Sequence, residues 1–304
     1  MPGFIEKIII KKSRNGGILL IISASRRTDI PCLYSEWFFN RISEGFVKTR
    51  NPVNKNQITE VSLKPDDVSG FVFWTKNPGP MMKNLKTLAD YEYYFQFTLT
   101  PYGDDIEPNL PDKKIIGDTF KALSGEIGAD RVMLRYDPVL LNDKYDFNFH
   151  IDAFGKMLNE MKNYTKKVTI SFIDEKYRGV RANVSKLRLT AITDKMKIEI
   201  GRRFAETAAE FEIEIVSCAC GGLENVGIKP ASCVDASLFT KTREKINFPK
   251  DKNQRPECGC AVSKDIGAYN TCVNGCLYCY ANYMKNAAVA NFNMHDPGSP
   301  ALNP

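Results

Sequence analysis

The sequence predicts an α/β protein built as a partial (β/α) barrel of the TIM type, with about six strand and helix units. Two observations support this fold class. Short runs of β-branched and aromatic residues alternate with longer segments of helical period along residues 18–218, and each short run is almost continuously apolar. Such strands are buried on both faces, which is typical of a parallel sheet covered by helices.

The expected strands each end beside a polar or proline-rich loop. They cover residues 18–23, 70–74, 93–99, 131–136, 167–173 and 213–218. The clearest helical patterns lie over residues 80–91, 113–128, 147–162 and 194–211. Because parallel strands point their carboxyl ends to one edge of a sheet, where ligands bind in such folds, we expect the polar loops to form a common site.

Composition divides the chain into four segments. Residues 1–17 form an N-terminal extension, and residues 18–218 form the barrel core. Residues 219–271 have little periodicity, and we expect them to form a cysteine-rich cap with one short helix near Val234 to Lys245. Residues 272–304 hold a cysteine loop, a helix and a proline-rich tail that complete the barrel.

Composition and charge exclude several classes of protein. The 304 residues are 43% hydrophobic and 26% charged, as in soluble globular proteins, and the longest apolar run is too short to span a membrane. The start of the chain has no signal-peptide pattern, so we expect a cytoplasmic protein with no membrane partner. The net charge of +6 comes from scattered basic residues and does not by itself indicate nucleic-acid binding.

The cysteines are the most informative residues of the chain. There are nine, an odd number, and all but Cys32 lie from Cys218 onward. This distribution argues against a secreted disulfide framework and favours reduced thiolates that hold a metal. Only two histidines, His150 and His295, are present to share that task.

Three cysteines, Cys272, Cys276 and Cys279, stand together in the segment TCVNGCLYCYAN. Three thiolates from one tight loop can hold three irons of a cubane cluster and leave the fourth iron open to a chelating ligand. Gly275 lets the backbone curl through a positive φ. A structural zinc site, completed by an upstream cysteine, is the alternative.

This triplet, with Tyr278 before its last cysteine, resembles the cluster motif of the radical S-adenosylmethionine superfamily. The resemblance implies a [4Fe-4S] cluster that binds S-adenosylmethionine and, after reduction by a donor such as flavodoxin or ferredoxin, cleaves it to a 5'-deoxyadenosyl radical. That radical would abstract hydrogen from an unknown substrate. The segments YCYAN, FVFWTKNPGPMMKNL and FQFTLTPYGDDIEPNLP are similar to the subset containing spore photoproduct lyase. A nucleic-acid substrate is one reading of that likeness, but no basic and aromatic stripe supports it.

The triplet follows every expected strand, whereas in the superfamily the motif follows the first strand. Together with SASRRTDIP, TRNPVN, CGCAVSKDIGAYNTC and HDPGSP, it identifies the chain, from Ile21 onward, as a member of the family called domain of unknown function 1848. A circular permutation explains the order, because the two ends of a barrel lie close together. The strand at 18–23 would then correspond to the superfamily's second strand.

This arrangement implies cofactor-binding roles for residues at the strand ends. In the first loop Asp29 would meet the ammonium of the cofactor and Arg26 or Arg27 its carboxylate. The full set of expected contacts is Ser25, Arg26, Arg27, Asp29, Thr98, Thr100, Arg135, Asp137, Ser171 and Tyr278. For each of them a contact within the protein alone, such as an ion pair between Asp29 and an arginine, is the alternative.

Five further cysteines lie between Cys218 and Cys260, ahead of the triplet. Cys218, Cys233, Cys258 and Cys260 predict a second metal centre, an auxiliary iron-sulfur cluster, with Cys220 as a spare. A structural zinc ion in the cap is the alternative reading of these four.

For the whole protein, the rival functions are a zinc-stabilised binding module and an iron-sulfur electron-transfer protein that does not cleave S-adenosylmethionine.

Overall fold

The computed structural model describes residues 19–54, 56–239 and 248–302. Its main sheet has eight parallel strands in the order β10-β1-β4-β5-β6-β7-β8-β9. The six longer strands are β1 Leu20–Ala24, β4 Val68–Thr75, β5 Tyr93–Thr98, β6 Val132–Val139, β7 Lys167–Phe172 and β8 Glu214–Ser217. Each lies where the sequence predicts a strand, which confirms the α/β class.

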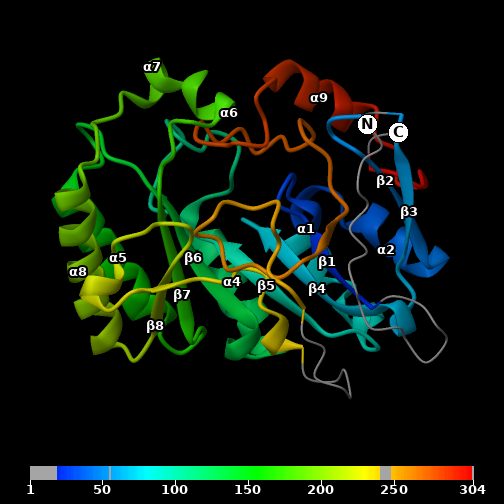
Figure 1. Ribbon diagram of the computed structural model, residues 1–304, viewed down its shortest axis with the longest axis horizontal. Helices are drawn as coiled ribbons and strands as arrows, with labels where there is room; N and C mark the ends of the chain where they lie inside the picture. Colours follow the sequence, from blue (N-terminus) through cyan, green and yellow to red (C-terminus); the bar gives the residue numbers. More distant parts are fainter. Residues whose placement is uncertain (1–18, 55, 240–247, 303–304) are drawn as a thin grey trace.

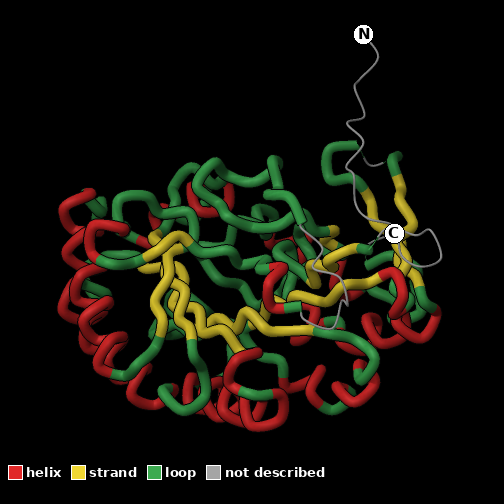
Figure 2. Tube along the Cα trace, turned by 60° about the horizontal axis from the view of Figure 1, so that its bottom comes forward, coloured by secondary structure: helices red, strands yellow, loops and turns green. Residues whose placement is uncertain are grey.

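The main sheet is open, so the structure shows an α/β fold with a parallel sheet and no closed barrel among the described residues. Its edge strands are β9 Lys229–Pro230 and β10 Lys264–Asp265, and no pairing joins these two within the described part of the chain. Two-residue strands offer too few ladder hydrogen bonds to complete a ring. Figure 2 shows the strands as a curved layer with helices outside it and loops over the opposite side.

Amphipathic helices cover the convex face of the sheet (Figure 1). The three longest match expected helices: α4 Lys113–Ile127, α5 Phe147–Met161 and α8 Asp194–Glu210. Each begins at a side chain that accepts a hydrogen bond from the first turn, namely Asp112, Asp146 and Thr193. Such caps fix the point at which each helix leaves its loop.

The single helix expected over residues 80–91 is wrong. The segment forms α3 Gly79–Met82 and a separate 3-10 helix, η2 Leu85–Leu88. Asn84 between them has a φ of −122°, outside the helical range. The three-residue period of η2 puts Leu85 and Leu88 on one side, where both are buried.

The cap segment packs on the concave face of the sheet. Successive strand residues point to opposite faces, so Phe95 meets the core under the helices while Tyr94 faces the concave side. There Tyr94 joins a second apolar cluster that contains Val234 and Phe239 of the cap. The inside of the curved sheet is therefore filled partly by chain that follows β8.

Regular structure in the cap is short. It consists of η4 Glu224–Val226, β9, η5 Ala236–Leu238 and β10. The helix expected near Val234 to Lys245 falls partly outside the described residues, and its described portion contains η5. The predicted extension at residues 1–17 lies entirely outside the described residues.

An antiparallel hairpin, β2 Phe46–Arg50 and β3 Ile58–Ser62, was not predicted. It follows α1 Ile30–Leu33 and α2 Ser35–Glu44, and the C-terminal helix α9 Lys285–Asn293 lies near it (Figure 1). The remaining short helices are η1 Pro65–Asp67, η3 Ala129–Arg131, α6 Arg178–Arg181 and α7 Val184–Leu187. No helix in the described ranges is both long and apolar enough to cross a membrane.

The C-terminal tail after α9 is hydrogen-bonded to α2 and β2. Trp37 Nε1 donates to the carbonyl of Ser299 at 2.9 Å, and the backbone N–H of Lys48 donates to the carbonyl of Pro300 at 2.8 Å. The C-terminal tail therefore lies against the helix and the strand that follow α1.

His150 of α5 is buried in the core as a neutral imidazole. Its Nε2 lies 2.8 Å from the carbonyl oxygen of Leu140, which can only accept, so Nε2 carries the proton. The other nitrogen, Nδ1, then accepts from the Tyr136 hydroxyl at 2.7 Å. Burial lowers the pKa of His150 from 6.5 to about 4.

We expect the free energy of unfolding to fall by about 3 kcal/mol as the pH drops from 6.5 to about 4 because of this residue. Within that window the unfolded chain binds a proton on His150 and the folded protein does not, so acid favours unfolding. Urea unfolding at a series of pH values measures the slope. The variant His150→Gln should lack this part of the pH dependence, and identical slopes in the two proteins would contradict the assignment.

Candidate functional site

The loops at the carboxyl edge of the sheet enclose a cavity of about 810 Å³. The loops after β1, β4, β6 and β7 contribute to its wall, as do both cysteine-rich segments. The predicted cofactor residues on the wall are Ser25, Arg26, Arg27, Asp29, Thr98, Arg135, Asp137, Ser171 and Tyr278. Parallel strands explain this convergence, because residues distant in the chain end at the same edge.

The cysteine triplet faces this cavity. Cys272, Cys276 and Cys279 line it from the loop between β10 and α9, and all three are free thiols. The loop curls at Gly275, whose φ is 75°, as the sequence predicts. Burial raises the pKa of Cys276 to about 12, although the ammonium of Lys76 opposes the shift. A thiol in this position would become a thiolate on binding a metal.

The donor set of the triplet is three cysteine thiols from one loop, which is the ligand chemistry that an iron-sulfur cluster takes. Among the residues that the structure describes, no three histidine, cysteine or acidic side chains are grouped so that they could hold one metal ion.

Neighbouring segments hold the cysteine loop in place. Asn183 Nδ2 donates to the carbonyl of Leu277, and Asn109 Nδ2 donates to the carbonyl of Val273, each at 2.8 Å. At Gly179 of α6 a Cβ atom would stand 2.2 Å from the carbonyl oxygen of Cys279. Only glycine permits that approach, so the sequence of α6 is fitted to the loop.

Asp29 joins three loops at the cavity. Its carboxylate accepts from the backbone N–H of Cys32 at 3.1 Å, which caps α1, and from that of Lys76 at 2.8 Å. Asn274 Nδ2, inside the cysteine loop, donates to it at 3.2 Å. Burial raises the pKa of Asp29 to about 6. These contacts support a positioning role, and the expected contact with an ammonium stays a prediction.

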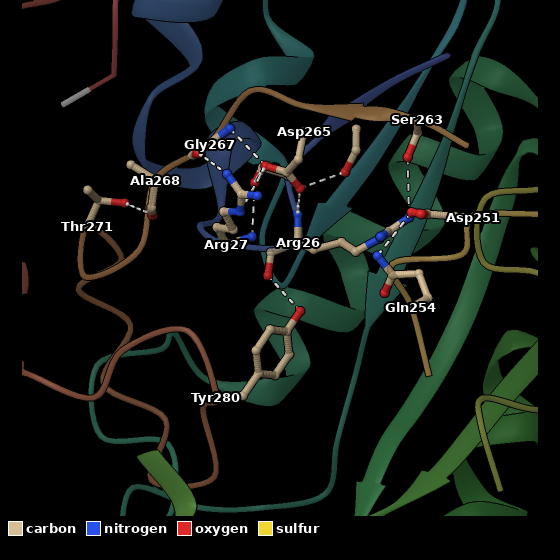
Figure 3. Close-up of polar contacts among 12 residues, drawn as sticks. Arg26, Arg27, Asp251, Gln254, Ser263, Asp265, Gly267, Ala268, Thr271 and Tyr280 are labelled. Carbon is tan, nitrogen blue, oxygen red and sulfur yellow. Dashed lines mark hydrogen bonds and ion pairs between the residues drawn. The ribbon is translucent and has the colours of Figure 1, made fainter. Parts of the chain in front are cut away.

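Asp265 of β10 is a site residue that sequence reasoning missed. Its carboxylate accepts from Ser23 Oγ at 2.9 Å, from Ser25 Oγ at 2.6 Å and from the backbone N–H of Arg26 at 2.9 Å (Figure 3). The carbonyl of Arg26 in turn accepts from the Tyr280 hydroxyl at 2.6 Å. The loop after β1 is thus held between β10 and the cysteine loop. The segment SKDIG, between the two cysteine sets, was the available signal.

Glu107, also missed, centres a buried ion network beside the triplet. It accepts from Lys76 Nζ at 2.8 Å and from Thr100 Oγ1 at 2.7 Å, and Lys113 and Tyr278 donate to it as well. Burial alone would raise the pKa of Glu107, but the two lysines outweigh it and hold the pKa at about 2. The structure places Thr100 in this network and not on the cavity wall, contrary to the predicted cofactor contact.

Arg135 connects the predicted cofactor residues to the second set of cysteines. On the concave face of β6, its Nη1 donates to Gln96 Oε1 and to Cys233 Sγ, both at 3.0 Å. Its Nη2 pairs with Asp137, whose carboxylate also accepts from Ser171. Arg135, Asp137 and Ser171 therefore form one connected group on the cavity wall.

All four cysteines of the predicted second centre line the same cavity: Cys218, Cys233, Cys258 and Cys260. The sulfurs of Cys218 and Cys233 are 3.5 Å apart. Cys220, the predicted spare, is not on the wall, and its thiol donates to the carbonyl of Cys218 at 3.3 Å. The four cysteines that the sequence selects therefore share one cavity wall, and their role as metal ligands stays a prediction.

Comparison with known proteins gives one match. The model of a family described as Domain of unknown function (DUF1848) matches residues 21–281 of this chain, a range that includes both sets of cysteines. No curated protein and no solved structure is significantly similar to it.

Proposed function

We propose that this chain, which belongs to the DUF1848 family, is a radical S-adenosylmethionine enzyme. Cys272, Cys276 and Cys279 would hold its [4Fe-4S] cluster. The observation that carries the proposal is that one curled loop presents three thiols to a cavity at the carboxyl edge of a parallel sheet. When bound, the cluster would supply an electron that cleaves S-adenosylmethionine into methionine and a 5'-deoxyadenosyl radical.

The position of β10 supports the proposed circular permutation. β10 ends shortly before the cysteine loop, and it pairs in parallel with β1, with Lys264 opposite Ile22. The cysteine loop therefore follows β10, an edge strand that lies next to β1 in the sheet but comes after β1 in the chain. This is the relation expected if the first strand and loop of the superfamily's barrel now stand at the end of the sequence.

Residues of the chain would bind and orient the cofactor. Arg27 suits the carboxylate, because its guanidinium is partly exposed in the cavity and lies over the ring of Tyr269 at 5.1 Å. Thr98 and the group formed by Asp137 and Ser171 offer oxygen atoms to hydroxyl or ammonium groups. Lys76, held by Glu107, places a buried positive charge near the triplet.

The test is cleavage of the cofactor by the full chain. We expect anaerobically reconstituted protein, given dithionite and S-adenosylmethionine, to form 5'-deoxyadenosine and methionine in equal amounts. A cytoplasmic flavodoxin or ferredoxin would replace dithionite in the cell. Iron-loaded protein that forms no 5'-deoxyadenosine would favour an electron-transfer protein, and colourless protein that holds only zinc would favour a binding module.

A further inference from the structure

We propose that Cys218, Cys233, Cys258 and Cys260 form a second, four-thiolate metal centre in the wall of the cavity that the triplet also faces. Its ligand chemistry is that of an iron-sulfur cluster or a zinc ion. Four protein ligands leave no open coordination position. This centre would therefore stabilise the cap or carry electrons, whereas the triplet leaves room for a cofactor.

The first support is the way the chain brings the four sulfurs together. Two cap segments, residues 231–234 and 258–261, run beside each other. The backbone N–H of Ala261 donates to the carbonyl of Val234 at 3.0 Å, and the N–H of Val234 points at Cys260 Sγ at 3.4 Å. Gly259 makes this approach possible, because a Cβ there would meet Ser232 Oγ at 2.6 Å.

The four thiols form a chain of contacts. Cys218, at the end of β8, touches Cys233 at 3.5 Å between sulfurs. Cys233 interacts through its side chain with Cys260, and Cys260 interacts in the same way with Cys258. As described, the sulfurs do not yet converge on one ion, so metal binding requires side-chain rotation. Cys258 and Cys260 flank Gly259 in an irregular segment, and both side chains are buried.

The second support is the set of hydrogen bonds that holds Cys233 in place. Its carbonyl accepts from the Tyr94 hydroxyl at 2.8 Å and from Gln96 Nε2 at 3.0 Å, both on the concave face of β5. Its sulfur accepts from Arg135 Nη1 at 3.0 Å. A cysteine fixed by two strands is preorganised as a ligand, because little conformational entropy remains to be lost when a metal binds.

The third support is charge. Four thiolates around a zinc ion or a [4Fe-4S] core leave a net negative charge that the protein must offset. Two guanidinium groups share the cavity wall with these cysteines. Arg135 contacts Cys233 directly. The side chain of Arg26 donates to Ser263 Oγ at 3.3 Å (Figure 3) and lines the same cavity. Buried cations beside several buried thiols are what an anionic metal centre needs.

The test measures metal in full-length protein that lacks the triplet. The variant Cys272→Ala/Cys276→Ala/Cys279→Ala should retain either about four irons and four sulfides or about one zinc per chain. The variant Cys233→Ala/Cys260→Ala should lose that same amount relative to the wild type. Cys220→Ala is the matched control, since Cys220 lies in the cap but off the cavity wall, and it should keep the wild-type content.

A folded triplet-free variant with neither iron nor zinc would overturn the inference, with circular dichroism reporting the fold. Iron with sulfide identifies a cluster, with an electron paramagnetic resonance signal after reduction, and zinc alone identifies a single-ion site. The inference does not rest on the proposed function, because different cysteines are involved. The two proposals can therefore fail separately. If the variant without the triplet retains metal but the wild type does not cleave the cofactor, the proposed function is wrong and the second metal centre is supported.

Discussion

Replacing Cys276 by alanine should abolish formation of 5'-deoxyadenosine. Cys276 is the middle ligand of the proposed catalytic cluster, and the other two cysteines of the triplet would each already bind an iron. Loss of a residue that only supports a metal ligand costs up to about 100-fold in activity, so loss of a ligand should cost more than about 100-fold. The measurement is product formation by anaerobically reconstituted protein, quantified by chromatography.

Controls for this variant come from cysteines off the cavity wall. Cys32→Ala and Cys220→Ala should form product at close to the wild-type rate, since neither residue lines the cavity. Iron content gives an independent readout. It should fall by about four per chain in Cys276→Ala and stay unchanged in the controls. Undiminished product formation by Cys276→Ala would rule out the triplet as the site of cofactor cleavage.

Replacing Glu107 by glutamine should destabilise the protein by about 3–5 kcal/mol. Glu107 is 1% exposed and is paired with Lys113 and with Lys76, whose side chain is 12% exposed at the cavity beside the triplet. Glutamine keeps the shape of the side chain but removes its charge, so the ammonium of Lys76 would be left buried without a carboxylate. Urea unfolding compares the free energy of unfolding of the variant with that of the wild type.

A matched control lies two residues away in the same loop. Asp105 pairs with Lys144 at 3.1 Å, but its side chain is 44% exposed, so Asp105→Asn should cost less than about 1 kcal/mol. The double variant Lys76→Met/Glu107→Gln should recover part of the stability lost in Glu107→Gln, because it removes the unpaired charge. If Glu107→Gln costs no more than Asp105→Asn, the buried network does not stabilise the fold in the way proposed.

Much of the fold could be predicted because it depends on local sequence pattern. The six longer strands are apolar runs of β-branched and aromatic residues, and α4, α5 and α8 combine an apolar stripe with a capping side chain. The prediction of one helix over residues 80–91 was wrong because the apolar period of this segment fits either an α-helix or shorter turns. Packing of Leu85 and Leu88 decided between them. The β2 and β3 hairpin was missed although Val47 and Thr49 alternate with more exposed residues.

Part of the site could also be predicted. Close spacing in the chain predicted that Cys272, Cys276 and Cys279 lie together, and all three line the cavity. Gly275 takes the positive φ that was expected. Polar residues after apolar strands indicated which loops would meet. Glu107 gave no such signal, since an acidic residue in a polar loop looks solvated until its buried partners are known. Asp265 was missed because its two-residue strand is too short to be recognised from a local pattern.

The sequence alone determined the chemistry that this protein can offer: cysteine thiols in two sets, cationic and hydroxyl groups at the ends of apolar strands, and membership of one family. Those properties are fixed by residue type and by short spacings along the chain. Only the tertiary structure decided that β10 lies beside β1, that the cap fills the concave face of an open sheet, and that both cysteine sets face one cavity. The physical reason is that these contacts join residues up to about 240 positions apart, and such pairings depend on burial and shape complementarity that local patterns do not encode.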